Sequence, residues 1–129
     1  MTKAERAQQL RDDPITHYNC AQAVLMPFAE EHGLDEGFAA DLAAHFGGGM
    51  GFGGTCGALT GALMALGLDW ADEETAQALV DEFRRTEGET ACARLLERQQ
   101  AEGGSKKAFC DALIAHCVRL VEQKSKKRS

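Results

Sequence analysis

The five cysteines are the residues of this chain best suited to chemistry. A cysteine thiolate can attack a disulfide or bind a soft metal ion. None of the five belongs to a C-x-x-C pair, so the close spacing typical of zinc sites and dithiol motifs is absent. Any shared site must therefore be assembled by the fold from Cys20, Cys56, Cys92, Cys110 and Cys117.

Cys56 has the most informative sequence neighbourhood. It follows a segment, 47–54, in which six of eight residues are glycine, and the pattern predicts a helix that begins near Thr55. With Thr55 as the N-cap, Cys56 would lie in the first helical turn, where unpaired backbone N–H groups and the helix dipole favour a thiolate. We therefore expect the pKa of Cys56 to be lowered, which would make its thiol reactive or a ready metal ligand.

Glycines on both sides of Cys56 could let a neighbour come close. Gly57 and Gly61 are one helical turn apart, so one face of this helix has almost no side chains. Either another helix or a prosthetic group could pack there. Before Cys56, an anion or a cluster sulfide could rest against backbone N–H groups, or the segment could be a tight crossing. The candidate cofactor-binding glycines are Gly49, Gly54, Gly57 and Gly61.

These motifs resemble a family named after the pattern C-GCAxxG-C-C, whose members are small proteins with four characteristic cysteines and a proposed redox activity. The resemblance covers about 19–120, and the segments 19–25, 46–50 and 56–62 carry it most clearly. It implies that the four functional cysteines, as redox thiols or as metal ligands, are Cys20, Cys56, Cys92 and Cys110.

Two positions depart from the pattern of that family. Cys117 is an extra cysteine seven residues after Cys110, so it could share a helix face with Cys110 and take over its role. The Gly-Ser pair expected shortly before the third cysteine is Gly88-Glu89 here. The resemblance gives a class of chemistry and leaves the substrate and the redox partner unknown.

Three functions remain as hypotheses. In the first, the chain is a thiol–disulfide or electron-transfer protein, a possible oxidoreductase, in which Cys56 attacks and Cys20 or Cys92 is the resolving partner. In the second, the four matched cysteines form a four-thiolate site for zinc or an iron–sulfur cluster. In the third, the chain is a non-catalytic structural bundle whose thiols are buried and inert.

Other motifs are weaker candidates. His17 lies three residues before Cys20 and could be a ligand or a base for the thiol, although a surface histidine is the simpler interpretation. The segment 49–54 has the G-x-G-x-x-G form of a dinucleotide fingerprint, but a helical pattern precedes it where the fingerprint requires a strand. We expect packing roles for His45, His116, Met64 and Trp70.

Helical periodicity predicts the elements that position these residues, and no strand pattern or internal repeat is evident. We expect an all-α, compact bundle of about six helices, with the Gly-rich loop before the CGAxxG helix. Pro27 should kink or shorten the helix that contains it. The expected helical segments are a short polar one at 3–11 and then 16–31, 35–46, 55–67, 72–87, 90–101 and a last helix that follows Ser105 and ends near 123.

Length and composition restrict the class of protein. The 129 residues suggest one helical domain, at 1–123, followed by a basic tail at 124–129 that we expect to be solvated. The net charge of -6 argues against a general nucleic-acid binder, and no stretch approaches the ~20 apolar residues of a membrane span. The N-terminus lacks a signal-peptide core, so we expect a cytoplasmic protein, with a homodimer as one possibility.

Overall fold

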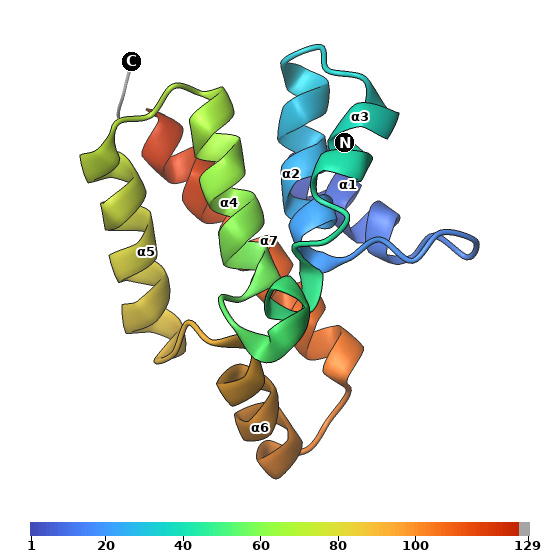
Figure 1. Ribbon diagram of the computed structural model, residues 1–129, viewed down its shortest axis with the longest axis vertical. Helices are drawn as coiled ribbons and strands as arrows, with labels where there is room; N and C mark the ends of the chain where they lie inside the picture. The colour runs from blue at the N-terminus through green and yellow to red at the C-terminus, as the bar shows by residue number, and fades with distance from the viewer. Residues whose placement is uncertain (127–129) are drawn as a thin grey trace.

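The computed structural model describes residues 1–126, and the regular secondary structure of that part of the chain is helical (Figure 1). Its only extended pairing there is one isolated bridge. Seven α-helices and one π-helical turn confirm the all-α class, although the count exceeds the expected six or so. The elements are α1 (Lys3–Arg11), α2 (Cys20–Glu31), α3 (Glu36–Leu42), η1 (Gly49–Gly53), α4 (Gly57–Leu68), α5 (Glu73–Glu87), α6 (Cys92–Glu102) and α7 (Lys106–Lys126).

Capping side chains decide where α2 begins. The Asn19 side chain accepts from the Gln22 N–H at 2.8 Å, and the Gln22 side chain accepts from the Asn19 N–H at 2.8 Å. This capping box satisfies two N–H groups that the helix itself leaves unpaired. Cys20 is therefore the first residue of α2, and Thr16 and His17, which we expected inside the helix, lie before it.

The second expected helix ends at Glu31 as predicted and is not shortened by Pro27, whereas the end of the third expected helix needs correction. Pro27 lies inside α2, but the helix continues to Glu31 because its neighbours are almost all buried and tertiary packing holds it in place. The third expected helix ends at Leu42 instead of Phe46, and residues 43–46 continue as turns. The backbone carbonyls of Ala43 and Ala44 accept from the Asn19 amide at 3.2 and 3.0 Å, which ties these turns to the start of α2.

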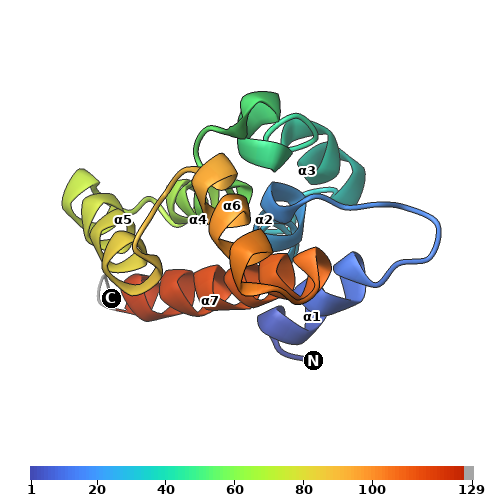
Figure 2. The same ribbon diagram turned by 90° about the horizontal axis from the view of Figure 1, so that it is seen from below.

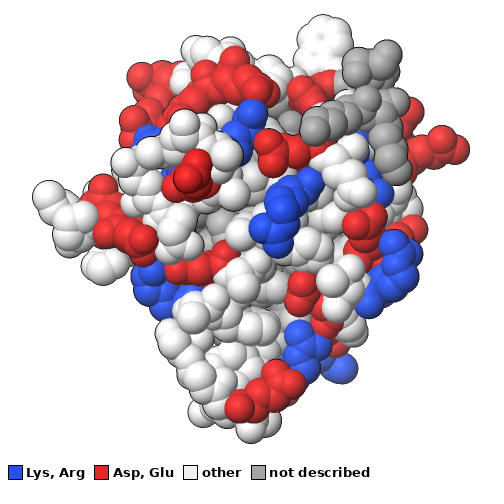
Figure 3. Space-filling model, turned by 180° about the vertical axis from the view of Figure 1, so that it is seen from behind, with Lys and Arg blue, Asp and Glu red and all other residues white. Residues whose placement is uncertain are grey.

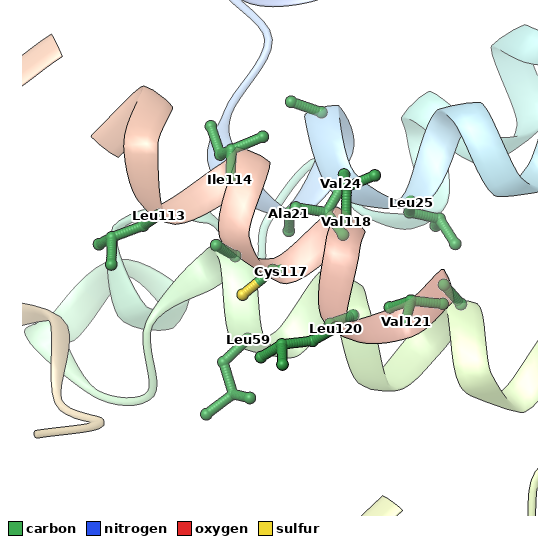
Figure 4. Packing of buried hydrophobic residues seen from close by; sticks show 14 of the residues in the cluster. Ala21, Val24, Leu25, Leu59, Leu113, Ile114, Cys117, Val118, Leu120 and Val121 are labelled. Atoms are coloured by element: carbon green, nitrogen blue, oxygen red, sulfur yellow. The ribbon is translucent and has the colours of Figure 1, made fainter. Parts of the chain in front are cut away.

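The core forms where α2, α4 and α7 pack against one another (Figures 1 and 4). In Figure 4, aliphatic side chains of α7 fill the space between α2 and α4. Small residues on α2 and α4 let their backbones come close, and α5 covers the side of α4 and α7 with Leu79 and Phe83, both fully buried. The labelled core residues of α7 are Leu113, Ile114, Cys117, Val118, Leu120 and Val121.

The residues expected to pack in the core divide into two groups. Met64 is half-buried against the core, and the His116 ring stacks on Phe83 with centroids 6.2 Å apart. Trp70, by contrast, is 83% exposed, and His45 is also exposed. Trp70 lies in the turn after α4 with φ 59°, and its N–H bonds back to the Gly67 carbonyl at 3.1 Å. This turn points the indole ring away from the core.

The Gly-rich segment forms the turn η1 because its backbone is left-handed at most positions. Gly48, Gly49, Gly51 and Gly53 all have φ between 61° and 81°, which glycine adopts without steric cost. Met50 also has a positive φ of 61°. The segment is therefore a fixed turn in front of α4 and neither an ordinary helix nor a strand.

The C-terminal helix extends further than expected. α7 continues to Lys126. Lys124, which we expected in a solvated basic tail, is buried and forms an ion pair with Glu82 of α5 at 2.8 Å. Residues 127–129 of that tail lie outside the described part of the chain. None of the helices within residues 1–126 is long and apolar enough to cross a membrane. On the face in Figure 3, Lys and Arg side chains are interspersed with Asp and Glu.

Candidate redox site

The four matched cysteines come from four elements that meet at one end of the bundle. Cys20 begins α2, Cys56 is the N-cap of α4, Cys92 begins α6, and Cys110 lies in the second turn of α7. Cys110 acts electrostatically on each of the other three thiols, and Cys92 also acts electrostatically on Cys56. The fold therefore assembles the cluster of Cys20, Cys56, Cys92 and Cys110, which we call the thiol cluster.

A short backbone pairing holds two members of the thiol cluster together. Thr55 and Ala91 form an isolated antiparallel bridge. The Cys56 N–H donates to the Thr90 carbonyl at 2.8 Å, and the Cys92 N–H donates to the Gly54 carbonyl at 2.6 Å. Because side chains alternate along extended chains, Cys56 and Cys92 lie on the same side of this bridge. No sequence pattern indicated the pairing, since it is only one residue long on each side.

Cys56 differs from the expectation in position and in acidity. It is the N-cap of α4, one residue before the first turn, and it is 4% exposed. Burial raises the pKa of its thiol to about 11, although the backbone N–H groups of Leu59 and Ala58 favour the thiolate. The predicted lowering of the Cys56 pKa was wrong because the helix start acts on a thiol that is removed from water.

Cys110 has the acidity that was expected for Cys56. The Cys20 and Cys110 side chains share a hydrogen bond, which lowers the pKa of Cys110 to about 7. Burial opposes this shift, and the positive charges of Arg11 and Lys106 add to it. The same hydrogen bond, followed by burial, raises the pKa of Cys20 far above its ordinary value. Cys20 therefore keeps its proton and donates it to a Cys110 thiolate.

Arg11 of α1 supports the Cys20–Cys110 pair. Its Nε donates to Asp111 Oδ1 at 2.8 Å, and its Nη1 donates to the Tyr18 carbonyl at 2.8 Å. These bonds fix the guanidinium where its charge lowers the pKa of both thiols. Sequence reasoning missed Arg11 because α1 reads as a polar surface helix, and only the tertiary fold brings it to Cys110.

The candidate cofactor-binding glycines are in contact with the protein itself. A Cβ at Gly61 would lie 2.6 Å from the Ala21 carbonyl oxygen of α2, and one at Gly57 would lie 3.2 Å from Cys20 Cβ. A Cβ at Gly49 would lie 2.9 Å from Cys92 Cβ, and one at Gly54 would meet the Phe52 ring at 2.7 Å. Close packing of α2, α6 and η1 thus uses these four glycines.

Cys117 and His17 differ from the cysteines of the thiol cluster, although Cys56 acts electrostatically on the Cys117 thiol. Cys117 points into the core between α7 and α4, is fully buried, and has a pKa raised well above its ordinary value by burial (Figure 4). It therefore cannot replace Cys110 as a reactive thiol. His17 is exposed and outside α2, so it does not share a helix face with Cys20.

The metal hypothesis was tested against the placement of potential ligands. Within residues 1–126, no group of three or more His, Cys, Asp or Glu side chains is positioned to hold one metal ion, and all five cysteines are free thiols. The thiol cluster in this arrangement therefore does not fit a four-thiolate site for a single zinc ion.

The fold and the site together define an all-helical protein with a cluster of four thiols that includes one acidic cysteine. The chain belongs to the family described as "Putative redox-active protein (C_GCAxxG_C_C)", whose model matches residues 18–124. This confirms the family that the cysteine and glycine motifs indicated. No curated protein and no protein of solved structure matches the chain.

Proposed function

We propose that this protein is a cytoplasmic thiol–disulfide redox protein whose reacting pair is Cys110 and Cys20. The observation that carries the proposal is the placement of the Cys20 and Cys110 thiols next to each other and beside the Arg11 guanidinium, whose charge favours a thiolate in this pair. Both thiols are half-buried, while Cys56 is buried. An attacking thiol is most effective when its pKa is close to the surrounding pH, and Cys110 meets this condition.

The reaction follows from these roles. The Cys110 thiolate attacks a disulfide of the redox partner, forms a mixed disulfide and releases one partner thiolate. This step removes the negative charge from Cys110, and with it the largest cause that raises the pKa of Cys20. The Cys20 thiol then loses its proton to the released thiolate and attacks the Cys110 sulfur. The second partner sulfur leaves as a thiolate and takes up a proton from solvent. The products are the Cys20–Cys110 disulfide and two partner thiols.

Cys56 and Cys92 have supporting roles in this proposal. Cys92 is half-buried, and burial raises the pKa of its thiol, so it is a weaker nucleophile than Cys110 near neutral pH. Cys56 is more buried than Cys92 and lies on the same side of the backbone bridge. In this proposal Cys56 and Cys92 can reduce the Cys20–Cys110 disulfide by exchange and become a disulfide themselves, so that the thiol cluster holds up to two pairs of electrons.

A redox titration tests the proposal. The reduced chain would be equilibrated without oxygen in mixtures of reduced and oxidised dithiothreitol, and the free thiols counted by alkylation and mass spectrometry. We expect a first reversible loss of two thiols. Cys110→Ser and Cys20→Ser should abolish this loss, and Cys117→Ala, a change at the core thiol, should keep it.

Two other results would contradict the proposal. Stoichiometric zinc, or iron with sulfide, lost in Cys56→Ser and in Cys20→Ser alike, would make the thiol cluster a metal site. Five thiols that react only after unfolding would make the chain a structural bundle. Metal analysis on the same samples separates these outcomes.

A further inference from the structure

A groove of about 430 Å³ lies between the C-terminal half of α6 and the start of α7. Its volume is in the range of small-molecule binding sites. Lys106 is the one charged residue among those that line it, so the groove is suited to an anionic group. The lining residues are Leu96, Gln99, Gln100, Gly104 and Lys106.

Helical register connects this groove to the thiol cluster. On α6, Cys92, Leu96 and Gln100 are spaced by four residues and share a face, and on α7, Lys106 and Cys110 do the same. Figure 2 shows α6 crossing the first turns of α7. The groove therefore lies along the two helix faces that carry the Cys92 and Cys110 thiols.

Gln99 and Lys106 have different roles at the groove. The Gln99 side chain is buried, and its amide donates to the Gly103 and Gly104 carbonyls at 3.2 and 2.9 Å, which fixes the turn at the end of α6. The neighbouring Lys107 forms ion pairs with Asp12 and Asp111 at 2.7 and 2.8 Å. Lys106 forms no ion pair with a carboxylate among the described residues; its charge acts on the Cys92 and Cys110 thiols, and it lines the groove.

We propose that this groove binds the carboxylate-bearing part of a small-molecule disulfide and so presents its sulfur to Cys110. The Lys106 ammonium attracts the carboxylate, the Gln100 amide can donate a hydrogen bond to it, and Leu96 contacts the carbon chain. The inference rests on the proposed function, because it assigns a substrate class to the same thiols.

The exchange conserves atoms and electrons. Cys110 as thiolate bonds to one sulfur of the small disulfide, and the S–S bond breaks to release one carboxylate-bearing thiolate. Cys20 then bonds to the Cys110 sulfur and its proton passes to the released thiolate, while the second small thiolate leaves and takes up a proton from solvent. The small disulfide is reduced by two electrons, and the Cys20–Cys110 pair is oxidised by two.

The test compares two small disulfides that differ in charge. Glutathione disulfide carries carboxylates, and bis(2-hydroxyethyl) disulfide carries no charge. The rate of thiol loss at Cys110 would be measured with each by quenching with an alkylating reagent and mass spectrometry. The readout is the rate with glutathione disulfide divided by the rate with bis(2-hydroxyethyl) disulfide. A general change in Cys110 reactivity affects both rates and cancels in this ratio.

We expect Lys106→Gln to lower the ratio about two- to fivefold, the size of one partly screened charge interaction. Arg119→Gln removes an exposed positive charge further along α7 and should leave the ratio unchanged. An unchanged ratio in Lys106→Gln would overturn the groove assignment and leave the proposed function standing. Oxidation of Cys110 by neither disulfide would overturn the proposed function itself.

Discussion

At the scale of the residue, the position of a thiol at a helix start does not decide its acidity by itself. Cys56 has the backbone N–H groups of α4 beside it, yet burial raises the pKa of its thiol. Cys110 lies in the second turn of α7, accepts a hydrogen bond from Cys20 and has the positive charges of Arg11 and Lys106 nearby, and its pKa falls to about 7. Groups that interact directly with the thiolate outweigh burial at Cys110, whereas burial outweighs them at Cys56.

The pH dependence of alkylation tests this account. Because the pKa of Cys110 lies below the ordinary 9.0, its thiolate is present above about pH 7 and is lost as the pH falls through that value. We expect the alkylation rate of Cys110, followed by mass spectrometry, to have its midpoint near pH 7. Cys20→Ala removes the hydrogen-bond donor and should move the midpoint upward, which lowers the rate at neutral pH by roughly tenfold per pKa unit.

Cys20→Ser is the matched control for this experiment, since its hydroxyl can still donate to Cys110. Its midpoint should stay closer to that of the unchanged chain. Equal midpoints for Cys20→Ala and the unchanged chain would show that the hydrogen bond does not set the acidity of Cys110.

At the scale of the element, the close contact of α2 and α4 positions Cys20 against the start of α4. The contact depends on glycines that leave room for the opposite backbone, and Gly61 is the tightest of those in α4. A helix–helix contact this close leaves no space for an added methyl group unless the helices move apart. The position of Cys20 in the thiol cluster is therefore coupled to the small residues of α4.

Two glycine substitutions in α4 should have opposite effects on stability. Gly61→Ala places a Cβ 2.6 Å from the Ala21 carbonyl oxygen and should lower the free energy of unfolding by about 1–3 kcal/mol. Gly67 lies in the same helix with open space around it, so Gly67→Ala should raise that free energy by about 0.5–1 kcal/mol. Urea denaturation measures both. A loss at both positions would mean that the contact with α2 is not the cause.

Much of the arrangement of helices and turns could be predicted from the sequence. Periodicity and capping residues placed most of the helices, and the glycines at Gly57 and Gly61 predicted a close approach. The start of α2 follows from the local Asn19–Gln22 capping box, a signal that sequence reasoning missed. The turn η1 and the bridge at Thr55 were not accessible, because they depend on backbone angles and on contacts between distant segments that only the folded chain shows. The acidic thiol was assigned to Cys56 for the same reason, since its burial and the Cys20–Cys110 contact are tertiary facts.

At the scale of the whole molecule, α7 connects the thiol cluster to the far end of the bundle. It carries Cys110 near its start and packs against α1, α2, α4, α5 and α6 along its length. At its end, the buried Lys124 forms an ion pair with the half-buried Glu82 of α5. The residues near the C-terminus thus belong to the fold as far as Lys126.

A homodimer stays a prediction that sedimentation equilibrium can check.

Removing the charge of Lys124 should destabilise the bundle. In Lys124→Ala the buried alkyl chain and the partner of Glu82 are both lost, and we expect the free energy of unfolding to fall by about 1–2 kcal/mol. Arg119→Ala, an exposed change on the same helix, should stay within about 0.5 kcal/mol of the unchanged chain. Equal effects of the two changes in thermal or urea denaturation would contradict the role given to Lys124.

The most direct test of the central claim is to identify the first disulfide that forms. The reduced, full-length chain would be treated without oxygen with one equivalent of a disulfide oxidant, the remaining thiols blocked with iodoacetamide, and the peptides mapped by mass spectrometry. Our account predicts a Cys20–Cys110 disulfide, with Cys56, Cys92 and Cys117 recovered as alkylated thiols. A first disulfide that contains Cys56 and leaves Cys110 free would contradict it.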